Sequence, residues 1–113
     1  RETLIITMIE TPEAVENAQE IASVSGIDAI LVGSSDLTQA MGMPGPPEVD
    51  AAIDKVIAAA KAAGKLVGVA GAGMTVNNIG RFQHFAGKGV QLLSAGAQDF
   101  IRQSGADFLK ALR

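Results

Sequence analysis

Apolar runs alternate with amphipathic segments four times along this chain. Near-continuous runs of Leu, Ile and Val predict strands buried on both faces of a parallel sheet, here over residues 4–9, 28–32, 66–69 and 90–94. The segments between them repeat apolar residues at helical spacing and predict helices over residues 12–25, 47–63, 75–85 and 98–112, with a short helical turn over 37–41. Gly26 and Gly64 are the expected stops of the first two long helices.

The start and the inner face of each predicted helix follow from the same pattern. Thr11 is the expected N-cap of the first helix, and Pro12 fits its first position. The apolar positions that define the helical faces are Ala14, Ala18, Ile21, Ala22, Val49, Ile53, Val56, Ile57, Ala60, Val76, Ile79, Phe82, Ile101, Phe108 and Leu112. Of these, we expect Ile101, Phe108 and Leu112 to be buried by the last helix.

Strands that alternate with helices predict an α/β fold with parallel pairing and right-handed crossovers. Four βα units make half of a (βα)8 TIM-type barrel, and 113 residues are too few for the roughly 200 or more of a complete one. The prediction is a single domain over residues 1–113, a C-terminal half-barrel without its N-terminal half. A small open sheet is the alternative. The start at Arg1, almost directly before a strand, suggests an excerpt or a cleaved product.

Composition excludes several classes of function. The chain has no cysteine, so it has no disulfide, thiolate metal site or cysteine nucleophile. The net charge is −3 and the nine Lys and Arg are scattered, so we expect no nucleic-acid partner. No apolar stretch approaches the ~18 residues of a membrane span, so we expect no membrane partner. The cytoplasm is the expected compartment.

Glu10 and Asp36 each follow one of the first two predicted strands. A carboxylate at the C-terminal end of a parallel strand lies where α/β proteins bind ligands. Two like charges close together repel unless a cation lies between them, so the pair predicts a site for Mg²⁺ or Mn²⁺, completed by substrate oxygens and water. The alternatives are a helix-start acid near Thr11 for Glu10 and an N-cap for Asp36.

The turn before Asp36 has a candidate role in ligand binding. Gly33, Ser34 and Ser35 would present backbone N–H groups near the start of a short helix, and such groups suit a carboxylate or a phosphate. The alternative is a tight turn that needs glycine for its backbone angles.

Three other features favour structural roles. The three glycines within residues 68–73 lack the Gly-Lys-Ser/Thr ending of a phosphate loop, which favours close packing at the sheet edge. His84 is the only histidine and falls late in a predicted helix, where it suits the surface or the helix dipole. Asp99 is expected to start the last helix.

Two stretches resemble the HpcH/HpaI aldolase/citrate lyase family. They are Met-Ile-Glu-Thr-Pro-Glu-Ala-Val-Glu-Asn from residue 8, and Gly-Ile-Asp-Ala-Ile-Leu-Val-Gly-Ser-Ser-Asp-Leu-Thr-Gln-Ala-Met-Gly from residue 26. The resemblance implies a βα-barrel with a divalent metal bound to one Glu and one Asp, which map onto Glu10 and Asp36. It also implies that the amides of Ser35 and Asp36, in the turn begun by Gly33 and Ser34, hold the carboxylate of a 2-oxo acid.

This chain differs from the family pattern in two ways. Many of the aldolases carry Gln two residues before the Glu, where this chain has Met8. The family's catalytic His and substrate-binding Arg belong to the N-terminal half of the barrel, and His84 does not match that His.

The resemblance implies the C-terminal half of a metal-dependent carbon–carbon lyase, an aldolase that releases pyruvate or a related 2-oxo acid from a 4-hydroxy-2-oxo acid. We expect this half alone to be inactive. Its expected partners are the small 2-oxo acid substrate and either an N-terminal half-barrel or a second copy, in a homo-oligomer. The alternatives are an acyl-CoA lyase of the same family and a non-catalytic half-barrel that serves as a structural or assembly module.

Overall fold

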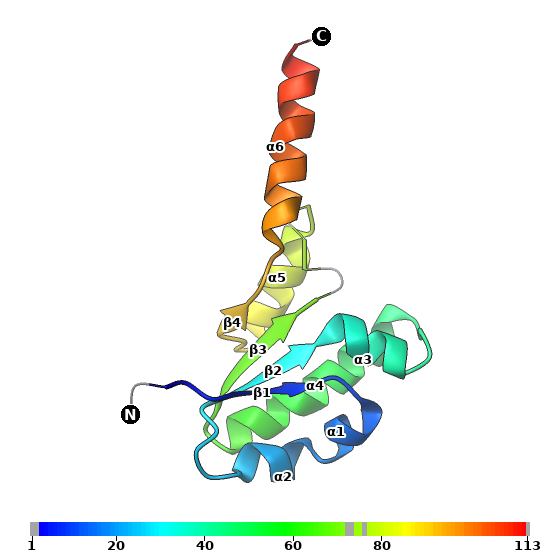
Figure 1. Ribbon diagram of the computed structural model, residues 1–113. Helices are drawn as coiled ribbons and strands as arrows, with labels where there is room; N and C mark the ends of the chain where they lie inside the picture. The colour runs from blue at the N-terminus through cyan, green and yellow to red at the C-terminus, as the bar shows by residue number, and fades with distance from the viewer. Residues whose placement is uncertain (1–2, 72–73, 76, 113) are drawn as a thin grey trace.

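A four-stranded parallel sheet forms the centre of the computed structural model, which describes residues 3–71, 74–75 and 77–112 (Figure 1). The strands pair in chain order and are β1 (Ile6–Ile9), β2 (Ala29–Gly33), β3 (Leu66–Ala70) and β4 (Leu92–Leu93). This sheet confirms the predicted α/β fold. Residues 72 and 73, in the predicted glycine-containing loop, and Val76, in a predicted helix, lie outside the described residues.

Within the described residues, six helices connect and follow these strands. They are α1 (Pro12–Glu16), α2 (Ala18–Ser23), α3 (Ser34–Ala40), α4 (Pro46–Ala62), α5 (Ile79–Gly87) and α6 (Ala97–Ala111). The Thr11 side chain caps α1 by accepting a hydrogen bond from the Ala14 N–H at 3.2 Å, as predicted. The predicted first helix is divided at Asn17, which ends α1 and precedes α2. In the described part of the chain, no helix is long and apolar enough to cross a membrane.

The core lies between one face of the sheet and helices α1, α2 and α4 (Figure 1). Alternate residues of the central strands, such as Ile30 and Val67, point into it and are buried. The predicted inner face of α4 is confirmed, since Val49, Ile53, Val56, Ile57 and Ala60 are all buried. Two ion pairs hold α5 against α4: Arg81 with Asp50 at 2.8 Å, and Lys88 with Asp54 at 2.6 Å.

The other face of the sheet carries apolar side chains, and no helix of the described residues covers it. Met8 on this face is 51% exposed. It lies beside Leu31 in the register, and Leu31 lies beside Gly68. Leu31 and Leu92 close over Gly68, where an added Cβ would lie 2.7 Å from Leu31 Cδ1 and 2.8 Å from Leu92 Cβ. In a complete barrel this face would be the interior.

Helix α6 extends away from the sheet and buries none of its residues (Figure 1). The predicted burial of Ile101, Phe108 and Leu112 is therefore wrong, because these side chains are between 64% and 74% exposed. The amphipathic pattern itself is present. Among the described residues, none buries the apolar side of α6.

Candidate functional site

The sheet register brings the ends of successive strands together. Ile9 pairs with Val32 and Gly33 pairs with Ala70, so Glu10 comes level with Gly33 just past the end of β1. This is the C-terminal edge of the parallel strands, where ligands bind in α/β folds.

The side chain of Glu10 lies directly against Gly33. A Cβ added to Gly33 would be 2.6 Å from Glu10 Oε1 and 2.9 Å from Glu10 Cγ. The backbone of Gly33 has φ −84°, which other residues adopt freely. Glycine is therefore needed here to make room for Glu10, and the alternative based on unusual backbone angles does not hold.

Asp36 and the turn residues occupy the first turn of α3. The N-cap of this helix is Gly33 and it makes no side-chain capping bond, so Asp36 is not the N-cap. Ser35 and Asp36 are exposed, whereas Ser34 is buried. The Ser34 hydroxyl donates a hydrogen bond to the Ala70 carbonyl at 2.8 Å. Ser35 and Asp36 thus face solvent at the strand edge, and the Ser34 hydroxyl holds the turn to β3.

The two carboxylates fit a hard divalent cation. Glu10 is partly exposed and Asp36 is exposed, and among the residues that the structure describes neither forms an ion pair. Because Gly33 has no side chain, Glu10 can lie over the turn that bears Asp36. No group of three or more His, Cys, Asp or Glu in residues 3–71, 74–75 and 77–112 has a metal-binding arrangement. Two carboxylates are a donor set that Mg²⁺ accepts, since this ion keeps several waters and binds through one or two carboxylates.

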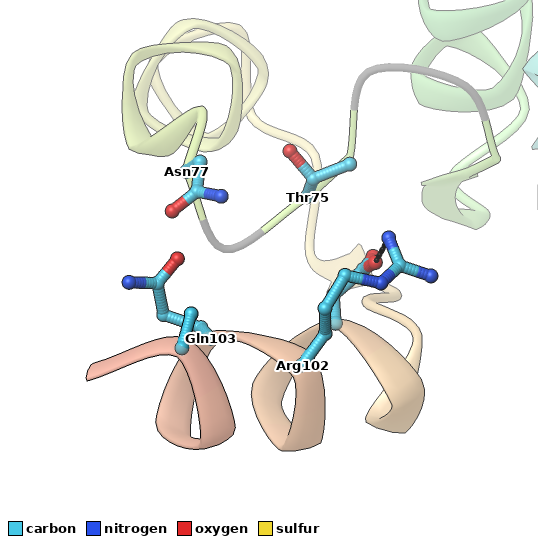
Figure 2. A pocket seen from close by; sticks show the side chains of 6 residues that line it. Thr75, Asn77, Arg102 and Gln103 are labelled. Atoms are coloured by element: carbon cyan, nitrogen blue, oxygen red, sulfur yellow. Dashed lines mark hydrogen bonds and ion pairs between the residues drawn. The ribbon is translucent and has the colours of Figure 1, made fainter. Parts of the chain in front are cut away.

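Two cavities adjoin this edge. One of about 420 Å³ is lined by Ser35, Gly71, Met74, Thr75, Ser94, Gly96, Gln98 and Asp99. A neighbouring cavity of about 250 Å³ lies between the loop after β3 and α6, where Thr75 and Asn77 lie across from Arg102 and Gln103 (Figure 2). Asp99 lies in the first turn of α6 and pairs with Arg102 at 3.4 Å, which confirms its predicted place at a helix start.

Of the residues that line these two cavities, sequence reasoning gave a ligand-binding role only to Ser35. Ser94 follows the last strand in the position that Glu10 has after the first, and this is the only signal that would have pointed to it. His84 lies in the last turn of α5, exposed and edge-on to Phe85 at 5.2 Å between ring centroids. Its predicted surface position is confirmed.

Four βα units with carboxylates past two successive strands define half of a TIM-type barrel with its ligand-binding edge. The family model of HpcH/HpaI aldolase/citrate lyase matches residues 1–100. The chain belongs to this family.

Curated relatives and solved structures agree with this assignment. The chain is 34% identical over 110 residues to a 4-hydroxy-2-oxo-heptane-1,7-dioate aldolase of Salmonella paratyphi B. The aligned residues cover 91% of this chain and 42% of that protein. It is 47% identical over 70 residues to the 4-hydroxy-4-methyl-2-oxoglutarate aldolase cghB of Chaetomium globosum, covering 59% of this chain and 26% of the relative.

Among solved structures, a HpcH/HpaI aldolase from Desulfitobacterium hafniense superposes with a TM-score of 0.78 at 28% identity, covering 98% of this chain and 43% of that one. A family protein from Burkholderia cenocepacia reaches a TM-score of 0.87 at 24% identity, covering 99% of this chain and 43% of that one, which shows the shared fold. The chain thus spans less than half the length of the relatives that it matches.

Proposed function

We propose that this chain provides the metal-binding and carboxylate-binding half of a carbon–carbon lyase that releases pyruvate, or a related 2-oxo acid, from a 4-hydroxy-2-oxo acid. One observation carries the proposal. The carboxylate of Glu10 lies over Gly33, at the start of the turn that bears Asp36. The family relationship supports the class of reaction, since the curated relatives are aldolases of 4-hydroxy-2-oxo acids.

In this proposal the residues divide the work of binding. Glu10 and Asp36 hold Mg²⁺ or Mn²⁺, and the cation, when bound, acts as a Lewis acid on the 2-oxo group. The backbone N–H groups of Ser35 and Asp36 receive the carboxylate of the 2-oxo acid. Both residues are exposed at the strand edge, so a small ligand reaches them from solvent.

The 4-hydroxyl of the substrate needs a base, and we propose that it comes from outside this chain. The only histidine, His84, is in the last turn of α5 rather than past the end of a strand. Without a base within reach of the reacting proton, this half binds but does not turn over.

The shape of the chain supports a partner that covers the bare sheet face. A compact monomer of this mass exposes about 5,800 Å², whereas this chain exposes 6768 Å². Its radius of gyration is 15.9 Å, against about 13 Å for a compact domain of this length. The protruding α6 contributes to the excess area of about 1,000 Å² together with the bare sheet face, and this area is close to one side of a standard interface. We propose that a further set of βα units covers this face: an N-terminal half-barrel in the working enzyme, and a second copy when the chain is alone.

A metal titration tests the binding proposal. Mn²⁺ should raise the melting temperature of the chain, because only the folded site binds it. The double substitution Glu10→Gln with Asp36→Asn should remove that increase, whereas Glu20→Gln, which changes an exposed acid of α2, should leave it intact. An equal increase in the double variant would place the metal elsewhere.

A cleavage assay with pyruvate detection tests the division of labour. The chain alone should release little pyruvate from a 4-hydroxy-2-oxo acid, and addition of a matching N-terminal half should restore release. Robust turnover by the chain alone would contradict the missing base and would make His84 the first residue to substitute.

A further inference from the structure

The loop after β3 is in close contact with the turn after β2. Gly71 has φ +104°, in the region that favours glycine. A Cβ added there would lie 2.7 Å from Ser35 Oγ, 2.8 Å from Ser35 N and 3.1 Å from Ser34 Oγ. Two of these three atoms belong to the residue directly before Asp36. The backbone of Gly71 therefore fills the space behind the turn.

Ser34 also connects the turn after β2 to the end of β3 through a hydrogen bond. Its buried hydroxyl donates to the carbonyl of Ala70, the residue before Gly71, at 2.8 Å. Ala70 is also the register partner of Gly33, so the hydrogen bond continues the β2–β3 pairing past the end of the strand. Neither Ser34 nor Gly71 faces Glu10 in any contact described above, so their effect on the site passes through Ser35 and Asp36.

We infer that Ser34 and Gly71 are positioning residues that fix Asp36 relative to Glu10 for an octahedral divalent cation. We call the Ser34–Ala70 hydrogen bond together with the Gly71 contact the clasp. The inference rests on the proposed function, because it takes Glu10 and Asp36 as the metal ligands. Mg²⁺ and Mn²⁺ depend on ligand oxygens held within a few tenths of an ångström, whereas Ca²⁺ accepts longer and more variable distances.

The atoms that a new Cβ would meet decide what Gly71→Ala does. The Ser35 amide nitrogen would have to retreat by about 0.6 Å to reach ordinary contact, and backbone cannot yield as a flexible side-chain end can. Ser34→Ala removes the hydrogen bond and adds no atom. Both changes release or displace the turn that carries Asp36.

The test measures Mn²⁺ and Ca²⁺ affinities of the whole chain by calorimetry, in wild type, Gly71→Ala, Ser34→Ala and a control. The control is Gly42→Ala, because Gly42 also has a positive φ of +83° but has nothing within 4 Å of an added Cβ. It introduces comparable backbone strain without the collision.

The clasp predicts a change of selectivity as well as of affinity. Both clasp variants should lose about tenfold in Mn²⁺ affinity and distinctly less in Ca²⁺ affinity, so that the Mn²⁺/Ca²⁺ affinity ratio falls by about threefold or more. Gly42→Ala should keep both affinities and the ratio. A loss of fold stability alone would lower both affinities together and leave the ratio unchanged.

Each outcome is decisive. If Gly71→Ala does not fold, Ser34→Ala carries the test, since it leaves the backbone conformation unstrained. An unchanged Mn²⁺/Ca²⁺ affinity ratio in the folded variants, whether or not both affinities fall, would overturn the clasp. The metal site itself would still be upheld if the chain with both Glu10→Gln and Asp36→Asn lost binding. Absence of Mn²⁺ binding by the wild-type chain would overturn the proposed function, and the clasp with it.

Discussion

Replacing Gly33 by alanine should weaken metal binding by displacing Glu10. The new Cβ would lie 2.6 Å from Glu10 Oε1 and 3.2 Å from Glu10 Cδ, so the carboxylate oxygen must move by about 0.8 Å to reach ordinary contact. Alanine adopts the φ of −84° at this position without strain, so the cost falls on the Glu10 side chain and little on the backbone.

The size of the effect follows from the tolerance of metal sites. Ligand distances within about 0.2 Å of ideal characterise a good site, and a displacement of about 0.8 Å exceeds that tolerance severalfold. We expect the Mn²⁺ dissociation constant to rise by about tenfold or more, which corresponds to about 1.4 kcal/mol or more of binding free energy. Calorimetric titration of Mn²⁺ into the variant measures this directly.

Gly80→Ala is the matched control for Gly33→Ala. Gly80 lies in the first turn of α5 with nothing within 4 Å of an added Cβ, so this change should stabilise the helix by less than the ~1 kcal/mol of an interior position and leave Mn²⁺ affinity unchanged. A folded Gly33→Ala chain with wild-type Mn²⁺ affinity would refute the reasoning, because Glu10 would then tolerate the collision and could not be a closely held ligand.

Two further predictions concern the bare sheet face and the core. In light scattering, the chain should associate at micromolar concentration. Met8→Lys on the bare face should shift it toward monomer, whereas Val24→Lys, similarly exposed after α2, should not. A wild-type chain that stays monomeric at every concentration would contradict the proposal that a partner covers this face. Ile53→Ala should lower the free energy of unfolding by about 2–5 kcal/mol, since Ile53 is fully buried in α4. In the unassociated chain, Phe108→Ala should change the free energy of unfolding by less than about 0.5 kcal/mol, measured by denaturant unfolding. A large decrease would show that α6 packs on the domain.

The strands and the long helix were predictable because their signals are local. Four apolar runs became four strands, and the spacing of residues such as Val49 and Ile53 gave the buried face of α4. Boundaries were less predictable. The last strand is Leu92–Leu93 rather than residues 90–94, although the N–H groups of Gln91 and Ser94 still donate to carbonyls of β3. The helix expected from residue 75 begins at Ile79.

The burial of α6 could not be predicted from its pattern. Phe108 and Leu112 repeat at helical spacing, which indicates an apolar face, but the pattern does not say whether the covering surface belongs to the same chain. The pairing of Glu10 with the Asp36 turn was predictable in outline, because parallel strands end at one edge. The reason for glycine at position 33 was not, since a close approach between distant residues leaves no local signal.

The glycines at the ends of two strands let polar groups approach one another closely at the proposed binding edge. Gly33 leaves room for Glu10, and Gly71 leaves room for the Ser35 amide, so two polar groups from different strands approach where side chains would otherwise separate them. Both approaches lie within the four βα units of this chain. In the proposed reaction the base would come from outside this chain, since the only histidine, His84, lies in the last turn of α5. Under the proposed function we expect binding and turnover to separate experimentally: this chain should bind the cation, and cleavage should need the βα units that cover the other face of its sheet.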